Sequence, residues 1–305
     1  MKIEILNRWS LKVIFECEAD SMKAAVELAC KQGVSLSGSD LRDSDLSCSD
    51  LSGSDLSGSD LSCSDLRDSD LRDSDLSCSD LSGSDLSGSD LRDSDLSGSD
   101  LSGSDLRDSD LRGSNLRGSD LSGSNLSCSD LSGSNLSGSD LRDSDLRGSN
   151  LRGSDLSGSD LRDSDLRGSN LRGSDLRDSD LRGSNLSCSD LSGSDLSCSD
   201  LSGVPKILNI HQAVFAAASQ PCALDMGQWH ACETTHCRAG WVVTLAGDGG
   251  KALEWAMGTS TAATLIYLAS DPERWKNERL PDFYCGNDDA LADMKRMAEE
   301  EAAQA

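Results

Sequence analysis

The sequence predicts a mainly β fold, a four-sided coil that has a small cap before it and a helical domain after it. Leucine recurs at every fifth position from Leu36 to Leu201, in 34 consecutive pentapeptides. A period of five fits neither the 3.6-residue repeat of a helix nor the two-residue repeat of a flat strand. It does fit a chain that turns a corner after every five residues. Four sides then make a coil of about 20 residues, stacked about 4.8 Å from the next.

Each position of the pentapeptide has an expected direction. The unit reads Ser, Asp or Asn, Leu, Ser or Arg, and then Gly, Cys or Asp. Leu and the Ser two positions before it point inward, as Leu41 and Ser39 do, and the residue between them points out. The buried Ser hydroxyls should find partners on other Ser or on backbone carbonyls. Gly at the corner tolerates a positive φ, and because Cys and Asp also occupy this position, we expect some corners to do without one.

These units resemble the pentapeptide-repeat family, whose consensus is a small residue, Asp or Asn, Leu or Phe, and two variable positions. The resemblance covers somewhat more than half of the chain. It implies a right-handed quadrilateral β-helix. It also implies a class of function, because some members mimic DNA and bind DNA gyrase, which they inhibit or protect from toxins and quinolones. Other members have no known activity.

The flanking segments predict two further domains beside the repeat, so that the chain divides into residues 1–34, 35–203 and 204–305. Residues 2–6 and 11–17 alternate as two strands around a turn, and Asp20 or Ser21 starts a helix that ends at Gly33. This ββα unit would cap the first coil. After Pro205, helices are expected at residues 210–219, 238–247, 249–257, 260–269 and 288–302. They would form a mainly α domain that closes the last coil.

The charge is unevenly distributed along the chain. Of the net charge of −26, the repeats carry −20, from 35 Asp and 15 Arg. Residues 35–110 hold 20 Asp and 5 Arg, whereas residues 111–203 hold 15 Asp, 10 Arg and all six Asn. Over about 40 Å of axis this is one net charge per roughly 2 Å, close to the 1.7 Å of duplex DNA.

Two functions stay open, and neither is enzymatic. In the first, the chain is an acidic interaction protein that mimics DNA and binds a DNA-handling protein. DNA gyrase, which is a DNA topoisomerase, is an example of such a partner. In the second, the solenoid is a scaffold or spacer whose acidic ladders prevent aggregation, and the C-terminal helical domain recognises a protein partner. Direct binding of nucleic acid is disfavoured because phosphate contacts need a basic surface. The proposed binding face comprises Asp40, Asp45, Asp50, Asp55, Asp60, Asp65, Asp70, Asp75, Asp80, Asp85, Asp90, Asp95, Asp100, Asp105 and Asp110.

A second candidate site lies in the C-terminal domain. His230, Cys232, His236 and Cys237 fall within eight residues, and such residues can bind zinc. Cys222 or Cys285 would supply further ligands. The adjacent pair His236 and Cys237 would diverge on a helix, and no group that would orient a Cys/His nucleophile is identifiable. The alternative is a buried turn that starts a helix, with Thr234 or Thr235 as its cap, so no cofactor is expected.

The remaining features predict a soluble cytoplasmic protein. No signal peptide or membrane span is recognisable. Six cysteines occupy corners of the coil: Cys48, Cys63, Cys78, Cys128, Cys188 and Cys198. No two of them are 20 residues apart, so they cannot form a disulfide within one solenoid. Exposed free thiols are typical of a reducing compartment.

Overall fold

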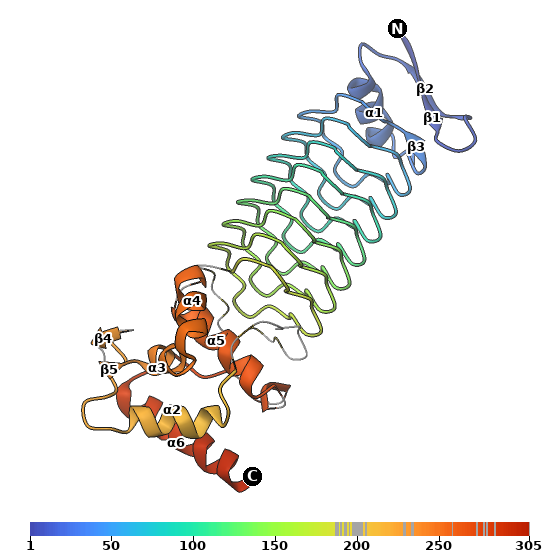
Figure 1. The fold of residues 1–305 in the computed structure, drawn as a ribbon. Helices are drawn as coiled ribbons and strands as arrows, with labels where there is room; N and C mark the ends of the chain where they lie inside the picture. The colour runs from blue at the N-terminus through green and yellow to red at the C-terminus, as the bar shows by residue number, and fades with distance from the viewer. Residues whose placement is uncertain are drawn as a thin grey trace.

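The computed structural model is a rod with a small cap at one end and a helical domain at the other (Figure 1). It describes residues 1–186, 189, 191, 194, 196, 204, 206–227, 230–232, 235–257, 259–272, 274–276, 278, 280–283 and 285–304. Corner residues Cys188 and Cys198 and the turn residue Thr234 lie outside this set, as does Gly203 at the predicted domain boundary. None of the helices within it is long and apolar enough to cross a lipid bilayer.

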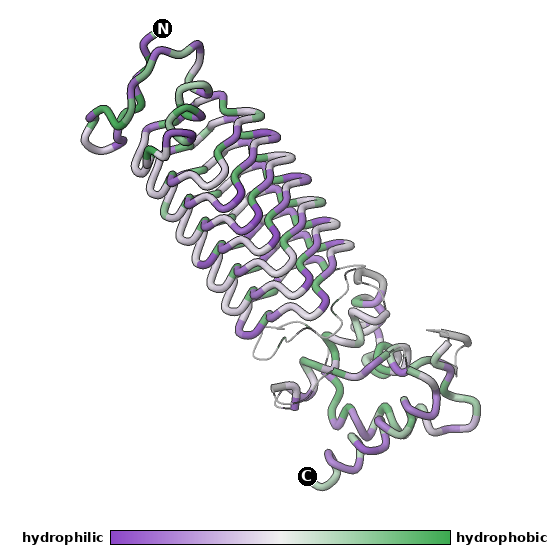
Figure 2. Tube along the Cα trace, turned by 180° about the vertical axis from the view of Figure 1, so that it is seen from behind, coloured by the Kyte–Doolittle hydropathy of each residue, from purple (hydrophilic) through white to green (hydrophobic). Residues whose placement is uncertain are grey.

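The repeat folds into a four-sided coil, as its period predicts. Each outward Asp or Asn pairs in parallel with the residue 20 positions later, from Asp40 with Asp60 to Asp165 with Asn185. Each side contributes so short an extended segment that the pairs are isolated bridges rather than long strands. The leucines are fully buried along the rod and form one continuous core. Figure 2 shows the hydrophobic and hydrophilic residues as rows that repeat from coil to coil.

The backbone of each unit is bonded both to the neighbouring coils and within its own corner. The Leu101 N–H donates to the Asp120 carbonyl (2.7 Å), and the Asp120 N–H donates back to Ser99 (3.0 Å). The Ser104 N–H closes the corner by donating to the Leu101 carbonyl (3.1 Å). Gly103, the third residue of this four-residue turn, has a φ of 64°. A positive φ at this third position is the mark of a type II turn.

The expectation that some corners avoid a positive φ is wrong. Every described corner from Gly38 to Gly183 has one, including Asp43 and Cys48, both at 55°. The inter-coil hydrogen bonds fix the same turn on every side, so a Cys or Asp at this position must adopt the left-handed conformation. Asp tolerates that conformation better than most residues do, whereas Cys has no such advantage.

The inward serines are bonded as predicted at most positions. The hydroxyl donates to the carbonyl of the Leu three residues earlier, as Ser99 does to Leu96 at 2.5 Å. Each serine is therefore satisfied within its own corner rather than by a ladder between coils. Within the described part of the chain, six inward hydroxyls have no hydrogen-bond partner: Ser39, Ser49, Ser54, Ser89, Ser104 and Ser124.

The N-terminal cap has the predicted ββα form. Strands β1 (Lys2–Asn7) and β2 (Val13–Glu18) form an antiparallel hairpin, and β1 also pairs with β3 (Ser39–Asp40) of the first coil. Helix α1 (Met22–Lys31) buries Ala25, Val26 and Ala29. Its N-cap is Ser21, whose hydroxyl accepts from Ala24 N–H at 3.2 Å.

The C-terminal domain is mainly helical, at the positions that the sequence predicts. Its helix α5 (Thr259–Ser270) contacts the end of the solenoid, where the Thr261 hydroxyl donates to the Ser189 carbonyl at 3.2 Å. The elements are α2 (Ile210–Ala218), β4 (His230–Cys232), β5 (Thr235–His236), α3 (Arg238–Leu245), α4 (Gly247–Met257), α5 (Thr259–Ser270), η1 (Arg274–Lys276) and α6 (Asn287–Gln304).

Candidate interaction surface

The outward Asp residues have a structural role that sequence reasoning missed. In the units from Asp45 to Asp180, the outward side chain accepts a hydrogen bond from the backbone N–H two residues later, as Asp100 Oδ1 does from Ser102 (3.0 Å). The Ser102 hydroxyl donates to the same oxygen (2.7 Å). Asn makes the same contact, since Asn135 Oδ1 accepts from the Ser137 N–H at 3.0 Å. The signal is present in the sequence, because Asp and Asn commonly bond a backbone group two residues on.

This contact predicts different effects for two substitutions at one position. We expect Asp100→Asn to change the free energy of unfolding by less than about 0.5 kcal/mol, because the amide oxygen keeps the cap. We expect Asp100→Ala to cost about 1 kcal/mol, because the Ser102 N–H loses its partner. Chemical denaturation measures both, with Asn135→Asp as the matched reverse change. Equal effects of Asn and Ala would contradict the capping role.

Arginine neutralises part of the acidic surface locally. Arg92 forms two parallel hydrogen bonds to Asp90 (2.8 and 2.5 Å) and lies 3.6 Å from Asp110 on the next coil. Hydrogen bonds from Arg92 hold the pKa of Asp90 below its ordinary value. Like-charge repulsion between stacked Asp residues is therefore partly relieved wherever Arg follows Leu beside Asp. By contrast, Asp100 and Asp120 form no ion pair among the described residues.

The fifteen predicted binding residues Asp40 to Asp110 do not form one face. Successive units lie on successive sides of the coil, so the parallel bridges sort them into four separate ladders. Asp100 belongs with Asp40, Asp60 and Asp80, whereas Asp50 belongs to the opposite side. We call the first of these the Asp100 side, made of the units that contain Asp40, Asp60, Asp80, Asp100, Asp120, Asp140, Asp160 and Asp180. We call the second the Asp50 side, made of the units that contain Asp50, Asp70, Asp90, Asp110, Asp130, Asn150 and Asn170.

The two opposite sides differ strongly in charge. Units of the Asp100 side hold eleven Asp and four Arg, a net charge of −7, and no Asn. Units of the Asp50 side hold seven Asp and five Arg, a net charge of −2. On the Asp50 side, Arg152 and Arg172 follow Asn150 and Asn170, and neither has a carboxylate partner among the described residues. The other two sides are also net acidic, but of the four sides only the Asp100 side has Asp at every described outward position.

Comparison with known proteins agrees with this repeat geometry. The family described as Pentapeptide repeats matches residues 32–62, 64–103, 104–143, 139–178 and 174–204. The chain belongs to the pentapeptide-repeat family. A search of curated proteins finds no match.

Solved structures of pentapeptide-repeat proteins are also similar to this chain. HetL of Nostoc sp. strain PCC 7120, involved in heterocyst differentiation regulation, is 29% identical over 54% of this chain and 87% of its own, with a TM-score of 0.27. QnrB1, a plasmid-mediated fluoroquinolone resistance protein, is 18% identical over 53% and 79%, with a TM-score of 0.35. A pentapeptide-repeat protein of the Arabidopsis thaliana thylakoid lumen is 31% identical over 33% and 67%, with a TM-score of 0.19. With TM-scores this low, the likenesses add nothing to family membership.

The Cys/His segment after the repeats starts a helix. Cys237 is buried and is the N-cap of α3, where its Sγ accepts from the Gly240 N–H at 3.3 Å. The expected cap at Thr234 or Thr235 is therefore wrong, because the N-cap position of this helix is Cys237. His236 is buried, and its ring packs edge-on against Trp241 at 4.7 Å between ring centroids.

The proposed zinc ligands are only partly described. The register of β4 and β5 pairs His230 with His236 in the backbone, but the side chains of His230 and Cys232 lie outside the described residues. Cys222 is exposed and Cys285 is half-buried. The zinc site therefore stays a prediction. The corner residues Cys48, Cys63, Cys78 and Cys128 are exposed free thiols, as expected.

Sequence reasoning missed a buried arginine in the same segment. Arg238 is 1% exposed and donates to Asp293 at 2.5 Å, to the Tyr267 hydroxyl at 3.2 Å and to Met297 at 3.0 Å. It joins α3 to α5 and α6. Burial alone would raise the pKa of Asp293, but hydrogen bonds and charge, chiefly from Arg238, outweigh it and hold that pKa below its ordinary value.

A histidine cluster ties α2 to the rest of the helical domain. His211 Nε2 lies 3.0 Å from Asp271, and Glu301 accepts from the His211 N–H (3.4 Å) and the Gln212 N–H (2.9 Å). Glu301 thus caps α2, whose own N-cap residue, Asn209, makes no side-chain cap bond. His211, Asp271 and Glu301 are close enough to hold a metal ion, but both Glu301 oxygens are already engaged by the helix. We therefore interpret the cluster as structural.

The His211 environment predicts an acid-sensitive domain. Burial lowers the pKa of His211 below its ordinary value, so the unfolded chain binds a proton more readily than the folded one. Stability should therefore decrease as the pH falls below about 6.5, the value for unfolded histidine. Urea unfolding at several pH values between 7 and 5 measures this, followed by tryptophan fluorescence because Trp275 lies 5.7 Å from the His211 ring. His211→Gln should remove the dependence in this range, and an unchanged dependence would contradict the assignment.

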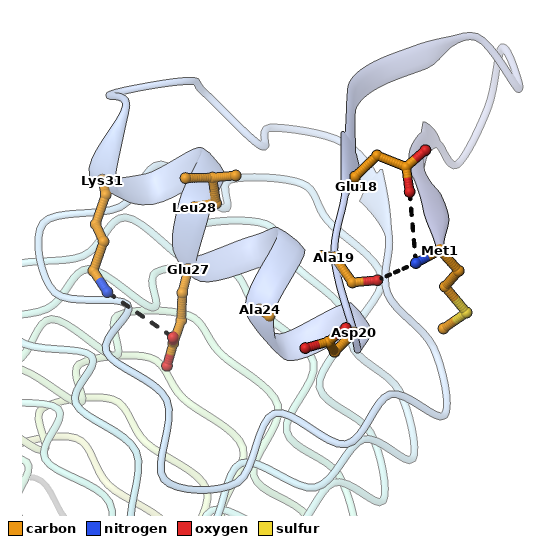
Figure 3. A pocket seen from close by; sticks show the side chains of 8 residues that line it. All are labelled: Met1, Glu18, Ala19, Asp20, Ala24, Glu27, Leu28 and Lys31. Atoms are coloured by element: carbon orange, nitrogen blue, oxygen red, sulfur yellow. Dashed lines mark hydrogen bonds and ion pairs between the residues drawn. The ribbon is translucent and has the colours of Figure 1, made fainter.

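The N-terminal cap has a pocket lined in part by charged side chains. Figure 3 shows its lining side chains, of which Met1 and Lys31 are the cations. The Met1 ammonium donates to the Ala19 carbonyl (2.9 Å) and lies 3.6 Å from Glu18, and Lys31 lies 4.0 Å from Glu27. These charges are paired with one another, so the pocket offers no uncompensated cation. It is lined by Met1, Glu18, Ala19, Asp20, Ala24, Glu27, Leu28 and Lys31.

Proposed function

We propose that this protein is a non-enzymatic interaction protein whose acidic rod occupies the basic DNA-binding groove of a DNA-handling enzyme. DNA gyrase is the first partner to test. The observation that carries the proposal is an excess of carboxylates over what the fold requires. Asp occupies 27 of the 33 outward positions from Asp40 to Asp200, and Asn occupies six.

In units without Arg, the fold itself gives no reason to prefer Asp to Asn. Both residues cap the corner through Oδ1, and Asn can add a bond between coils, as Asn115 Nδ2 does to Asp95 at 3.2 Å. Stacked carboxylates instead repel one another across about 4.8 Å. A surface charge close to the linear density of duplex DNA has a physical explanation if it replaces DNA in a basic groove.

The alternative function is a scaffold whose C-terminal domain recognises the partner. The two differ in how binding responds to salt. Ionic docking of the rod should weaken steeply as salt is added, because counterions screen the facing charges. Docking through an apolar surface of the helical domain should change little.

A supercoiling assay with purified DNA gyrase tests the proposal. The protein should inhibit supercoiling, and inhibition should fall about tenfold or more between about 50 and 200 mM salt. A variant with Asn at all fifteen positions from Asp40 to Asp110 should lose this effect while keeping its fold, which circular dichroism checks. If neither protein affects gyrase at concentrations well above that of the enzyme, gyrase is not the partner and the scaffold function is favoured.

A further inference from the structure

The turn of the N-terminal hairpin exposes large apolar side chains. Trp9 and Leu11 are each 69% exposed, and Val13 is 46% exposed. Leu11 also has a φ of 56°, a left-handed conformation that strains a leucine and suits Gly or Asn. Because the side chain makes no core contact and the backbone disfavours it, folding does not explain a leucine at this position. An exposed apolar tip of this kind is typical of a contact surface.

This hairpin is a direct continuation of the Asp100 side. Strand β1 pairs with β3, and Asp40 of β3 is the first residue of the ladder that continues to Asp60 and Asp80. The Arg8 guanidinium lies 3.4 Å from Asp60 and 3.9 Å from Asp80 and donates to the Ser59 carbonyl at 2.9 Å. Figure 1 shows the hairpin beside β3 at the end of the rod.

The Trp9 ring fixes the position of the tip against the rod. It lies over the corner before the Asp100 side, so close to Gly38 that an added Cβ there would come within 2.6 Å of the ring. A Cβ at Gly58 of the next coil would come within 3.2 Å of it. The apolar tip and the acidic ladder therefore lie next to each other and can meet one partner together.

We infer that the partner docks on the Asp100 side alone and that Trp9 and Leu11 form an apolar anchor at one end of that surface. The partner is a protein with a cationic groove, which complements the net charge of −7, and with an apolar contact next to the groove. The opposite side, where Arg152 and Arg172 have no carboxylate partner among the described residues, faces away from the groove. This inference rests on the proposed function and adds the docking side and the anchor to it.

Two matched double variants test the choice of side. Asp100 and Asp120 on one side, and Asp50 and Asp130 on the other, all lie in identical Ser-Asp-Leu-Ser-Gly units. Changing either pair to Asn creates the unit that already surrounds Asn135, and it alters the net charge of the protein by the same amount. Surface plasmon resonance against the gyrase holoenzyme should show weaker binding, by about tenfold, for Asp100→Asn/Asp120→Asn only.

A second pair of variants tests the anchor. Leu11→Asn should weaken binding about fivefold or more, because contact residues of this type carry much of the energy of an interface. The same change should leave the stability of the protein unchanged or raise it, because Asn accepts the left-handed φ. Leu208→Asn is the control, since Leu208 is 87% exposed at the other end of the rod.

The outcomes separate this inference from the proposed function. Equal loss of affinity in both Asp double variants would overturn one-sided docking and leave a general acidic rod. Unchanged affinity of Leu11→Asn would overturn the anchor. If the unaltered protein does not bind gyrase at low salt, the proposed function fails and the inference fails with it.

Discussion

Replacing Leu101 with alanine should destabilise the solenoid by about 2–5 kcal/mol. Leu101 is fully buried at the middle of the rod, with intact coils on both sides. The substitution removes apolar contacts and leaves a cavity that the hydrogen-bonded coils cannot close, which is the most damaging kind of core change. Chemical denaturation measures the loss, with exposed Leu208→Ala as the control that should change stability by less than about 0.5 kcal/mol.

A loss below about 1 kcal/mol for Leu101→Ala would contradict a tightly packed leucine core. It would mean that neighbouring side chains fill the space, which the regular spacing of the coils does not allow.

Asp293→Asn should destabilise the C-terminal domain by about 3–5 kcal/mol. The reason is the position of its partner, since the Arg238 side chain is only 1% exposed and Asp293 is the one carboxylate it contacts among the described residues. Without that carboxylate the guanidinium keeps its charge in an apolar environment. Asp289→Asn is the matched control on the same helix, because Asp289 is exposed and makes no ion pair among the described residues.

A double variant separates charge from packing at this pair. Arg238→Met/Asp293→Asn should be more stable than Asp293→Asn alone, because it removes the uncompensated charge. If the double variant is the less stable of the two, the guanidinium contributes mainly through its contacts with Tyr267 and Met297.

The sequence predicts the architecture well because the repeat is local. One Leu in every five residues determines the period, and the parallel bridges follow from it on every side. The N-terminal strands lie where the alternation of apolar and polar residues predicts them, and α1 begins after Ser21 and ends before Gly33. These features depend on residues that are close together in the chain.

The sequence predicts the sites less well, because they depend on the surroundings of single residues. The corner φ values at Asp43 and Cys48 are imposed by bonds between coils, so residue type alone predicts them wrongly. Cys237 as a helix cap and the contact of Arg238 with Asp293 depend on tertiary packing. The prediction of a single acidic face is wrong for a different reason. A four-sided coil places successive units on successive sides, so the repeat itself already divides Asp40 to Asp110 among four sides.

Competition with DNA tests the central claim most directly. A fluorescent duplex bound to DNA gyrase is titrated with the protein, and anisotropy follows the release of the duplex. The account predicts that the protein displaces the duplex, that displacement weakens steeply as salt is added, and that Asp100→Asn/Asp120→Asn is less effective than Asp50→Asn/Asp130→Asn. Binding of the protein to gyrase without release of the duplex would contradict DNA mimicry.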